Sequence, residues 1–189
     1  MEQKPRHHKE ETAIVLDFLT NGYPFDSRPL HMRTPIVQAV GKEFFTLLEL
    51  VPKRDVFLKT QDEVYIGEGK RDQIHHIVGK IPIDKLTSTA RAELEYVIKD
   101  LVKKNEQKFV DFFNASRPLT TRMHQLELLP GIGKKHMWEI IEAKDTKPFE
   151  SFKDIANRVK LMPDPEKLIV RRILLELEAK QEYYLFVDV

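Results

Sequence analysis

The run Leu128-Leu129-Pro130-Gly131-Ile132-Gly133-Lys134-Lys135 contains the residues whose types and spacing best suit a binding chemistry. Glycine has no Cβ, so Gly131 and Gly133 can adopt a positive φ and let the main chain approach another molecule closely. Pro130 fixes its own φ and disfavours helical backbone at the residue before it. The run therefore predicts a preorganised bend that a ligand can reach.

The segment after this bend has the pattern of an amphipathic helix. From Lys134 onward, Met137 and Ile140 recur at helical spacing. The amides of Gly133, Lys134 and Lys135 would then lie at a helix N-terminus, where N–H groups have no partner within the helix and the dipole is positive. We therefore expect an anion such as phosphate to bind there.

The stretch from residue 123 to 144 resembles a helix-hairpin-helix motif, with Leu126 and Leu129 on the first helix and Ile132 as a buried plug between the helices. In that family the hairpin amides and a nearby Lys or Arg hold phosphates of DNA or RNA with little sequence preference. The resemblance thus implies a nucleic-acid-binding set of Gly131, Ile132, Gly133, Lys134 and Lys135. Met137 departs from the motif, which often has a small alanine there. The alternative is that the bend only links two helices of a bundle.

Composition describes a globular protein rather than a secreted or membrane protein. The chain has 189 residues, of which 41% are hydrophobic and 32% charged, enough for one large domain or two small ones. It has no cysteine, which tells against disulfides and Cys-ligated zinc and favours the cytoplasm. Neither an apolar signal region before Glu11 nor a run of about eighteen apolar residues is present, so we expect no membrane contact.

Basic residues are concentrated around the bend. The formal net charge of the whole chain is +1, but residues 117 to 160 carry nine basic and six acidic side chains, a local excess of three positive charges. Such a patch predicts modest, salt-sensitive binding through few phosphate contacts.

Residues 12 to 84 are predicted to form a small OB-like β-barrel. β-Branched and aromatic residues recur between Gly, Pro and Asn, which is typical of short strands. Closure of such a barrel would hide the edges of the sheet. The expected strands are 13–19, 36–40, 44–51, 63–66 and 74–81. Residues 43 to 50 also fit a helical period, although Phe45 and Thr46 favour a strand.

Residues 85 to 116 are predicted to form a bridging helix, or two helices broken near Asn105. Apolar residues recur there at helical spacing after a candidate N-cap at Thr87 or Ser88. We interpret the phenylalanines Phe109, Phe112 and Phe113 as core residues rather than as a stacking platform.

Residues 117 to 180 are predicted to form a helix-hairpin-helix-like domain, followed by a tail from 181 to 189. Ser151 is expected to cap a helix, with Asp154 at the N3 position. A second hairpin is expected at 161–165, before a helix from 166 to 180. It lacks a Gly-x-Gly pair, which favours a structural role.

A second basic site is a candidate at Lys70 and Arg71. They follow Gly67-Glu68-Gly69, which we expect to be a hairpin turn between two barrel strands. The turn would present charge to a single strand of nucleic acid, with Tyr65 and His75 near it in sequence. A solvated basic turn is the alternative.

The sequence predicts no metal site, no cofactor and no catalytic residue. His75 and His76 would point to opposite faces of a strand unless a bulge intervenes. Neither a zinc-ligand spacing nor a nucleophile or phosphate-loop motif occurs. We therefore expect a protein that is not an enzyme.

Taken together, these parts predict an α+β protein, in which the OB-like β-barrel precedes an all-α helix-hairpin-helix-like domain. Their order, from about Glu11 to Leu177, resembles an uncharacterised archaeal family regarded as RNA-binding. That family pairs these two modules, and its genes tend to lie beside genes of translation and ribosomal RNA modification. The resemblance implies RNA as the ligand, with ribosomal or RNA-modification proteins as further partners.

Three alternatives stay open beside non-enzymatic RNA binding. DNA is one, because hairpin amides would hold its phosphates equally well. Another is a protein-interaction module that docks on a ribosomal or transcription protein, with Ile132 and Trp138 simply packed. The third is an accessory to an RNA-modifying enzyme that has no chemistry of its own.

Overall fold

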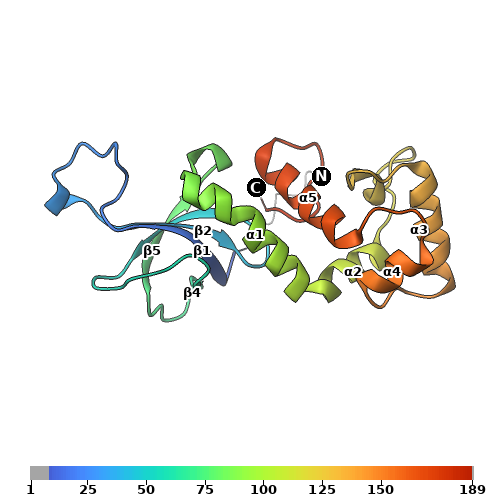
Figure 1. Cartoon of the computed structure of the whole chain (residues 1–189), viewed down its shortest axis with the longest axis horizontal. Helices are drawn as coiled ribbons and strands as arrows, with labels where there is room; N and C mark the ends of the chain where they lie inside the picture. Colours follow the sequence, from blue (N-terminus) through green and yellow to red (C-terminus); the bar gives the residue numbers. More distant parts are fainter. Residues whose placement is uncertain (1–8, 189) are drawn as a thin grey trace, which may run out of the picture. The chain divides into compact units, whose positions relative to one another are not determined.

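The computed structural model describes residues 9–188, and the chain divides into two compact units. Unit 1 consists of the described residues up to Val97 together with those from Phe186 onward. Unit 2 consists of Ile98–Leu185. The boundary falls inside the long helix α1 (Ser88–Lys104), drawn in light green in Figure 1.

Unit 1 contains an antiparallel five-stranded sheet that curls into a half-barrel (Figure 1). Its strand order is β4-β1-β2-β3-β5. The strands are β1 (Thr12–Leu19), β2 (Ile36–Gly41), β3 (Leu47–Pro52), β4 (Glu63–Tyr65) and β5 (Ile74–Lys80). All five predicted strands are thus present, and the helical alternative for residues 43 to 50 is wrong. β3 begins later than predicted because Phe45 has a φ of 55°, which ends extended backbone there.

Two expectations for this sheet need correction. The predicted closed barrel is a half-barrel, because β4 has only three residues and no pairing joins it to β5 in the described part of the chain. The segment Gly67-Glu68-Gly69 is therefore not a hairpin turn between paired strands. It connects β4 and β5, which lie at opposite ends of the strand order.

The inner face of the curled sheet is the core of unit 1. Alternate residues of the strands point into it, as the two-residue period of a strand requires. The cluster comprises Ala13, Val15, Val37, Ala39, Leu48, Leu50, Leu58, Val64, Ile66 and Ile74. Intervening residues such as Ile14, Leu16 and Val40 are also buried, so both faces of β1 and β2 are covered. Burial of this much apolar surface is the main source of the unit's stability.

Hydrogen bonds hold the start of α1 against the sheet. Thr87 is the N-cap, since its Oγ1 accepts a hydrogen bond from the Ala90 amide at 3.0 Å. The same hydroxyl donates to Asp17 on β1 at 2.6 Å. Gln38, fully buried on β2, accepts from the Thr87 amide at 2.8 Å and donates to the Lys85 carbonyl at 2.9 Å. The buried amide side chain is thereby satisfied.

Unit 2 is helical. After α1 come α2 (Glu106–Ala115), α3 (Lys134–Thr146), α4 (Phe152–Arg158) and α5 (Pro165–Glu178). Of the two alternatives for this region, the pair of helices broken near Asn105 is the one present, because Asn105 separates α1 from α2. Phe109 and Phe113 are fully buried, as expected of core residues, whereas Phe112, which was also predicted to lie in the core, is only half-buried. Unit 2 also has a short 3-10 helix, η3 (Gln125–Leu128), and two others, η1 (Leu30–Met32) and η2 (Ile83–Lys85), belong to unit 1.

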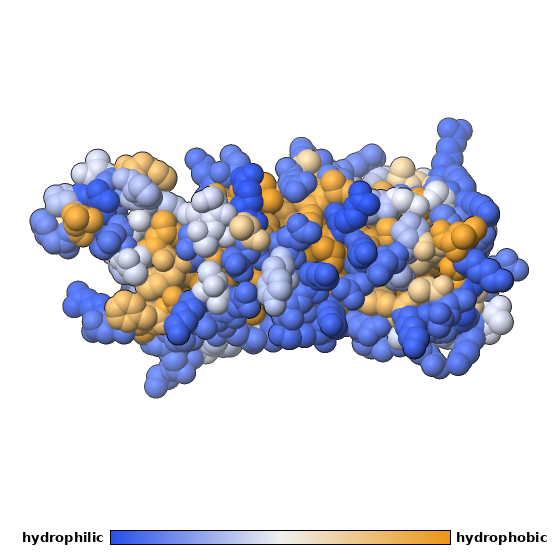
Figure 2. Space-filling model, viewed as in Figure 1, coloured by the Kyte–Doolittle hydropathy of each residue, from blue (hydrophilic) through white to orange (hydrophobic). Residues whose placement is uncertain are grey.

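No helix within residues 9–188 has both the length and the apolar character needed to cross a membrane. On the face drawn in Figure 2, hydrophilic residues predominate and hydrophobic ones appear as patches between them.

Candidate functional site

The bend lies between η3 and α3, and its two glycines differ in conformation. Gly131 has a φ of +93°, a region in which side chains are strained. Gly133 is the N-cap of α3, with extended backbone at φ −98° and ψ −176°. The positive φ that we allowed for Gly133 is therefore wrong, and only Gly131 needs to be glycine for conformational reasons.

The element before the bend is the four-residue 3-10 helix η3 rather than the α-helix expected around Leu126 and Leu129. Pro130 disfavours helical backbone at Leu129, which ends the helix. At the other end, His124 and Glu127 form a capping box: the His124 amide donates to Glu127 Oε2 at 2.8 Å, and His124 Nδ1 accepts from the Leu126 amide at 3.2 Å. The capping box at its start and Pro130 after its end therefore limit this helix to one short turn.

Ile132 is buried while both glycines beside it are exposed. Leu126 and Leu129, just before the bend, are buried as well. The Ile132 amide donates a hydrogen bond to the Leu129 carbonyl at 3.0 Å. The buried side chain of Ile132 thus holds the bend against the interior of unit 2. The main chain on either side of it faces solvent.

Several backbone N–H groups at the bend have no partner. The first hydrogen bond of α3 runs from the Met137 amide to the Gly133 carbonyl, at 2.9 Å. Within residues 9–188 the amides of Gly131, Gly133, Lys134 and Lys135 find no acceptor. They lie at the positive end of the α3 dipole, which favours an anion. This is the geometry that an oxyanion such as phosphate requires.

The two lysines after the bend differ in their availability to a ligand. Lys134 Nζ lies 3.0 Å from Glu127 Oε1 and donates to the Arg122 carbonyl at 2.8 Å. Together with the His124 amide, Lys134 holds the pKa of Glu127 below its usual range. Lys135 is 78% exposed, and its nearest carboxylate, Glu139, is 4.0 Å away. Lys135 is therefore the cation better able to reach a bound anion.

Arg172 of α5 holds the chain just before the bend. Its side chain is buried, and Nη1 donates to the Leu128 carbonyl at 3.1 Å. Nε pairs with Glu176 at 2.7 Å, and Nη2 donates to the Tyr183 carbonyl at 2.5 Å. The Glu176 carboxylate in turn accepts from the Leu185 amide at 2.7 Å. Nη1 and Nη2 thus fix two backbone carbonyls, while Nε is paired with the carboxylate that holds the Leu185 amide.

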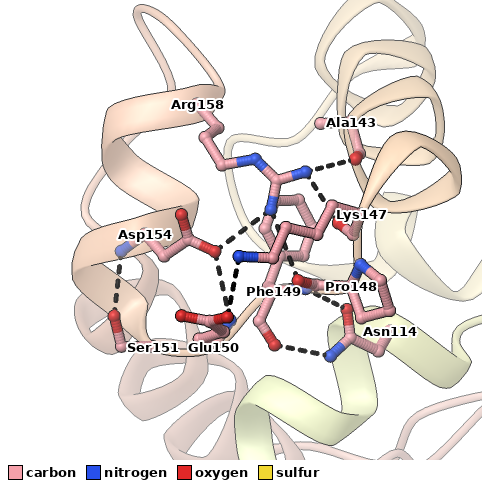
Figure 3. A network of polar contacts seen from close by, with 9 residues as sticks. All are labelled: Asn114, Ala143, Lys147, Pro148, Phe149, Glu150, Ser151, Asp154 and Arg158. Atoms are coloured by element: carbon pink, nitrogen blue, oxygen red, sulfur yellow. Dashed lines mark hydrogen bonds and ion pairs between the residues drawn. The ribbon is translucent and has the colours of Figure 1, made fainter.

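A second polar network holds the C-terminal end of α3 against α4 (Figure 3). The guanidinium of Arg158 donates to the carbonyls of Ala143 and Lys147, the latter at 2.7 Å, and to Asp154 at 3.1 Å. It also lies over the Phe149 ring, with 4.7 Å between Cζ and the ring centroid. The last carbonyls of α3 therefore have a partner, which a helix end needs.

The loop between α3 and α4 carries the predicted cap. The Asp154 amide donates to Ser151 Oγ at 3.0 Å, so the N-cap expected at Ser151 is confirmed (Figure 3). Asn114 of α2 exchanges two hydrogen bonds with the Phe149 backbone, at 2.8 and 2.9 Å. These contacts make the loop part of the scaffold that orients α3.

Lys70 and Arg71 belong to unit 1, whereas the bend belongs to unit 2. Lys70 is exposed and has no ion-pair partner in the described chain. Arg71 Nε donates to the Gly67 carbonyl at 2.8 Å, and the Gly69 amide donates to Tyr65 Oη at 3.0 Å. Arg71 and Tyr65 therefore hold the connection between β4 and β5 in shape, and Lys70 is the freer cation.

His75 and His76 depart from the prediction that their side chains point to opposite faces of a regular strand. The register between β3 and β5 shifts near His75, because Val51 pairs with His76 and Pro52 with Ile74. This irregularity brings the two imidazoles together, with their Nδ1 atoms 2.8 Å apart. No group of three metal-ligating side chains is found among residues 9–188.

Arg172 and His124 are site residues that sequence reasoning missed. Arg172 and Glu176 have the i,i+4 spacing of a helical ion pair within an otherwise apolar face, which was a usable signal. His124 stands three residues before Glu127, as a capping box requires, but histidine is an unusual cap residue. Only the fold reveals that Arg172 reaches Leu128.

The fold and the bend define a class of α+β protein: a curled antiparallel sheet joined to a helical unit whose exposed bend presents free amides. The sequence of this chain matches the model of a family of proteins of unknown function, DUF655, over residues 9–188. The chain belongs to this family.

Two relatives are archaeal. An uncharacterised protein of Methanocaldococcus jannaschii, MJ0038, is 48% identical over 180 residues, which cover 94% of this chain and 80% of that protein. The crystal structure of Af1531 from Archaeoglobus fulgidus, described as a DUF655 protein, has a TM-score of 0.87 and 50% sequence identity. The match covers 95% of this chain and all of that one.

Proposed function

We propose that this protein binds nucleic acid without catalysing a reaction on it, by holding a backbone phosphate at the bend. The observation that supports this most is the set of unpartnered amides of Gly131, Gly133, Lys134 and Lys135 on an exposed turn. Backbone amides at a helix N-terminus bind phosphate oxygens without reading a base. Lys135 supplies a nearby positive charge.

In this proposal, η3, the bend and α3 form a helix-hairpin-helix-like motif with a shortened first helix. Unit 1 is read as an OB-like barrel, supported by the strand order β4-β1-β2-β3-β5, which matches such a barrel opened between β4 and β5. Lys70 and Arg71 on the connection between those strands would supply a second basic surface. OB-like barrels use loops of this kind to contact nucleic acid.

RNA is the proposed ligand ahead of DNA, on the strength of the family resemblance alone. Amides that hold a phosphate do not sense the 2′-hydroxyl, so the bend by itself gives no preference. A place in the cytoplasm, near the ribosomal or RNA-modification proteins that the resemblance implies, belongs to the same proposal. A role in docking on a protein is the alternative, favoured by Trp138, which is 63% exposed rather than packed.

Substitution of Gly133 by Asp tests phosphate binding separately from folding. The backbone of Gly133 is extended and a Cβ there meets open space. Aspartate is a good N-cap, so Gly133→Asp should fold as well as the parent, while its carboxylate accepts from one of the free amides and repels phosphate. We expect its affinity for a short RNA, measured by fluorescence anisotropy at two salt concentrations, to fall by at least about tenfold.

The matched control is Gly79→Asp on β5, where a Cβ also meets open space and the added charge is the same. This variant should bind RNA with nearly parental affinity. Equal affinities for parent and Gly133→Asp would refute the proposed role of the bend. If the parent binds neither RNA nor DNA, the proposal fails as a whole and the protein-docking alternative gains.

A further inference from the structure

Unit 2 has a cavity of about 410 Å³ between residues 116–127 and one face of α3. Trp138 forms part of its apolar wall together with Met123, Met137 and Ile141. The Trp138 ring is 63% exposed, and it is the only tryptophan of the chain. A large flat ring left open at the edge of a cavity is suited to stack against a planar ligand.

The cavity adjoins the bend through Lys134, which lines it and carries one of the free amides. Trp138 follows Lys134 by four residues, so both lie on the same face of α3, about one turn of 5.4 Å apart. A single nucleotide carries its phosphate and its base at opposite ends. It can therefore place the phosphate at the bend and the base beside Trp138.

Two guanidinium groups on the cavity wall are available to a ligand. The side chains of Arg117 and Arg122 have neither a carboxylate partner nor a hydrogen-bond acceptor within residues 9–188. Both residues use only their backbone groups in the fold. Guanidinium donates hydrogen bonds to phosphate and to base edges, and it stacks on aromatic rings.

His124 is, with Ser116, one of two buried polar residues that line the cavity. It lines the cavity and is only 7% exposed. Because Nδ1 accepts from the Leu126 amide, a neutral ring carries its proton on Nε2, which has no partner in the described chain. Burial, aided by the Lys144 ammonium, holds the pKa of His124 below 6.5, which keeps the ring neutral at neutral pH. The cavity thus offers a donor on a largely buried imidazole, in addition to an exposed aromatic ring.

We propose that this cavity receives an unstacked nucleobase, which stacks on Trp138 while its own phosphate is held at the bend. Arg117, Arg122 and the Nε2 group of His124 are the donors that face the base and its sugar. This inference rests on the proposed function and adds a substrate class to it, namely single-stranded nucleic acid. A duplex keeps its bases stacked and paired, so it can offer only phosphates to the same surface.

Charge distinguishes this occupant from an apolar peptide. The cavity walls carry the cations of Arg117, Arg122, Lys134 and Lys144 against the carboxylates of Glu127 and Asp145. Lys134 and Glu127 form an ion pair at 3.0 Å, so the unpaired guanidinium groups give the cavity its positive charge. An aromatic ring in a cavity that is also lined by unpaired arginines suits the binding of bases along a polyanion without regard to sequence.

Trp138 fluorescence gives a direct test, because no other tryptophan contributes to the emission. A short single-stranded RNA should quench the emission, and its duplex of the same sequence should bind more weakly and quench less. Trp138→Leu should lower the affinity for the single strand by about tenfold or more, and Trp138→Phe should retain most of it. Arg122→Gln should lower the affinity severalfold.

Tyr96→Leu and Arg54→Gln are the matched controls, since both side chains are exposed and lie in unit 1. Both should bind like the parent. An abasic ribose-phosphate oligomer should bind equally to parent and Trp138→Leu, because it has no base to lose. Binding of single-stranded RNA without quenching, or with unchanged affinity in Trp138→Leu, would overturn the base site and leave phosphate binding at the bend intact. Absence of all binding would overturn both.

Discussion

Gly131 and Gly133 flank the same buried isoleucine but make different demands on the backbone. At Gly131 the positive φ would strain any residue that has a side chain. Space is not the obstacle, because a Cβ there would be in ordinary contact with Pro163, at 3.6 Å. At Gly133 the extended backbone accepts any residue, and an N-cap residue is preferred there. The bend therefore combines one glycine required by its conformation with one that the backbone does not require, and whose lack of a side chain serves the amides in the proposed function.

Serine at these two positions should change stability in opposite directions. Gly131→Ser should lower the free energy of unfolding by about 1 kcal/mol, because it places a side chain at positive φ. Gly133→Ser should raise it by a few tenths of a kcal/mol, on the order of the difference between serine and glycine as N-caps. Urea denaturation followed by Trp138 emission measures both. The same sign for both variants would contradict the assigned backbone conformations.

His124 should make the stability of unit 2 depend on pH. Burial and then Lys144 lower its folded-state pKa below 6.5, so the unfolded chain binds more protons between the two values. Stability is therefore fully present above pH 6.5 and is lost as the pH falls through 6.5 toward the folded-state pKa. Protonation also removes the Nδ1 acceptor from the Leu126 amide.

The variant His124→Asn isolates this effect, because asparagine caps a helix without titrating near neutral pH. Urea midpoints measured at a series of pH values should fall in the parent as the solution is acidified below 6.5. The fall should be smaller in His124→Asn. Parallel curves for the two proteins would show that His124 does not contribute.

At the scale of elements, α5 and α4 position the bend and α3 from outside the motif. Arg172 of α5 fixes the Leu128 carbonyl, and Arg158 of α4 fixes the last carbonyls of α3. The segment from the bend to the end of α3 is thus held at both ends by an arginine from another helix. Removal of either should affect both stability and binding.

Arg172→Met should lower the free energy of unfolding by about 3 to 5 kcal/mol, since it leaves the buried Glu176 carboxylate without its cation. The double variant Arg172→Met/Glu176→Leu should recover much of this loss, because no buried charge remains. Its RNA affinity should stay below that of the parent, since the Leu128 carbonyl is no longer held. Denaturation and RNA titration of both variants check this. Equal stability of the single and double variants would refute it.

These elements show which parts of the fold are predictable from local sequence. The strands, the break at Asn105 and the cap at Ser151 each depend on residues within a few positions of one another, and all were predicted. Three other features depend on residues far apart in sequence. They are the half-barrel, the irregularity at His75 and the hydrogen bond from Arg172 to the Leu128 carbonyl. The cavity around Trp138 was missed for the same reason, because periodicity gave no indication that this ring is left exposed.

At the scale of the whole molecule, net charge argues for weak electrostatic binding. The chain carries a formal charge of +1, so we expect the patch in unit 2 and the basic pair of Lys70 and Arg71 in unit 1 to attract a polyanion only weakly.

The salt dependence of RNA binding should therefore be shallow. If two or three phosphates are neutralised, a plot of log affinity against log salt concentration should have a slope of about −1.4 to −2.1 for a single strand. Lys135→Gln should reduce the magnitude of this slope by about 0.7. A slope several times steeper would mean an extensive basic surface that is not evident in this fold.

The most direct test of the central claim is a backbone amide NMR titration with a short RNA. The account predicts that the largest chemical-shift changes occur at the amides of Gly131, Gly133, Lys134 and Lys135, and that these changes are lost in Gly133→Asp. Saturating RNA that leaves these four amides unshifted would contradict the claim that they hold a phosphate.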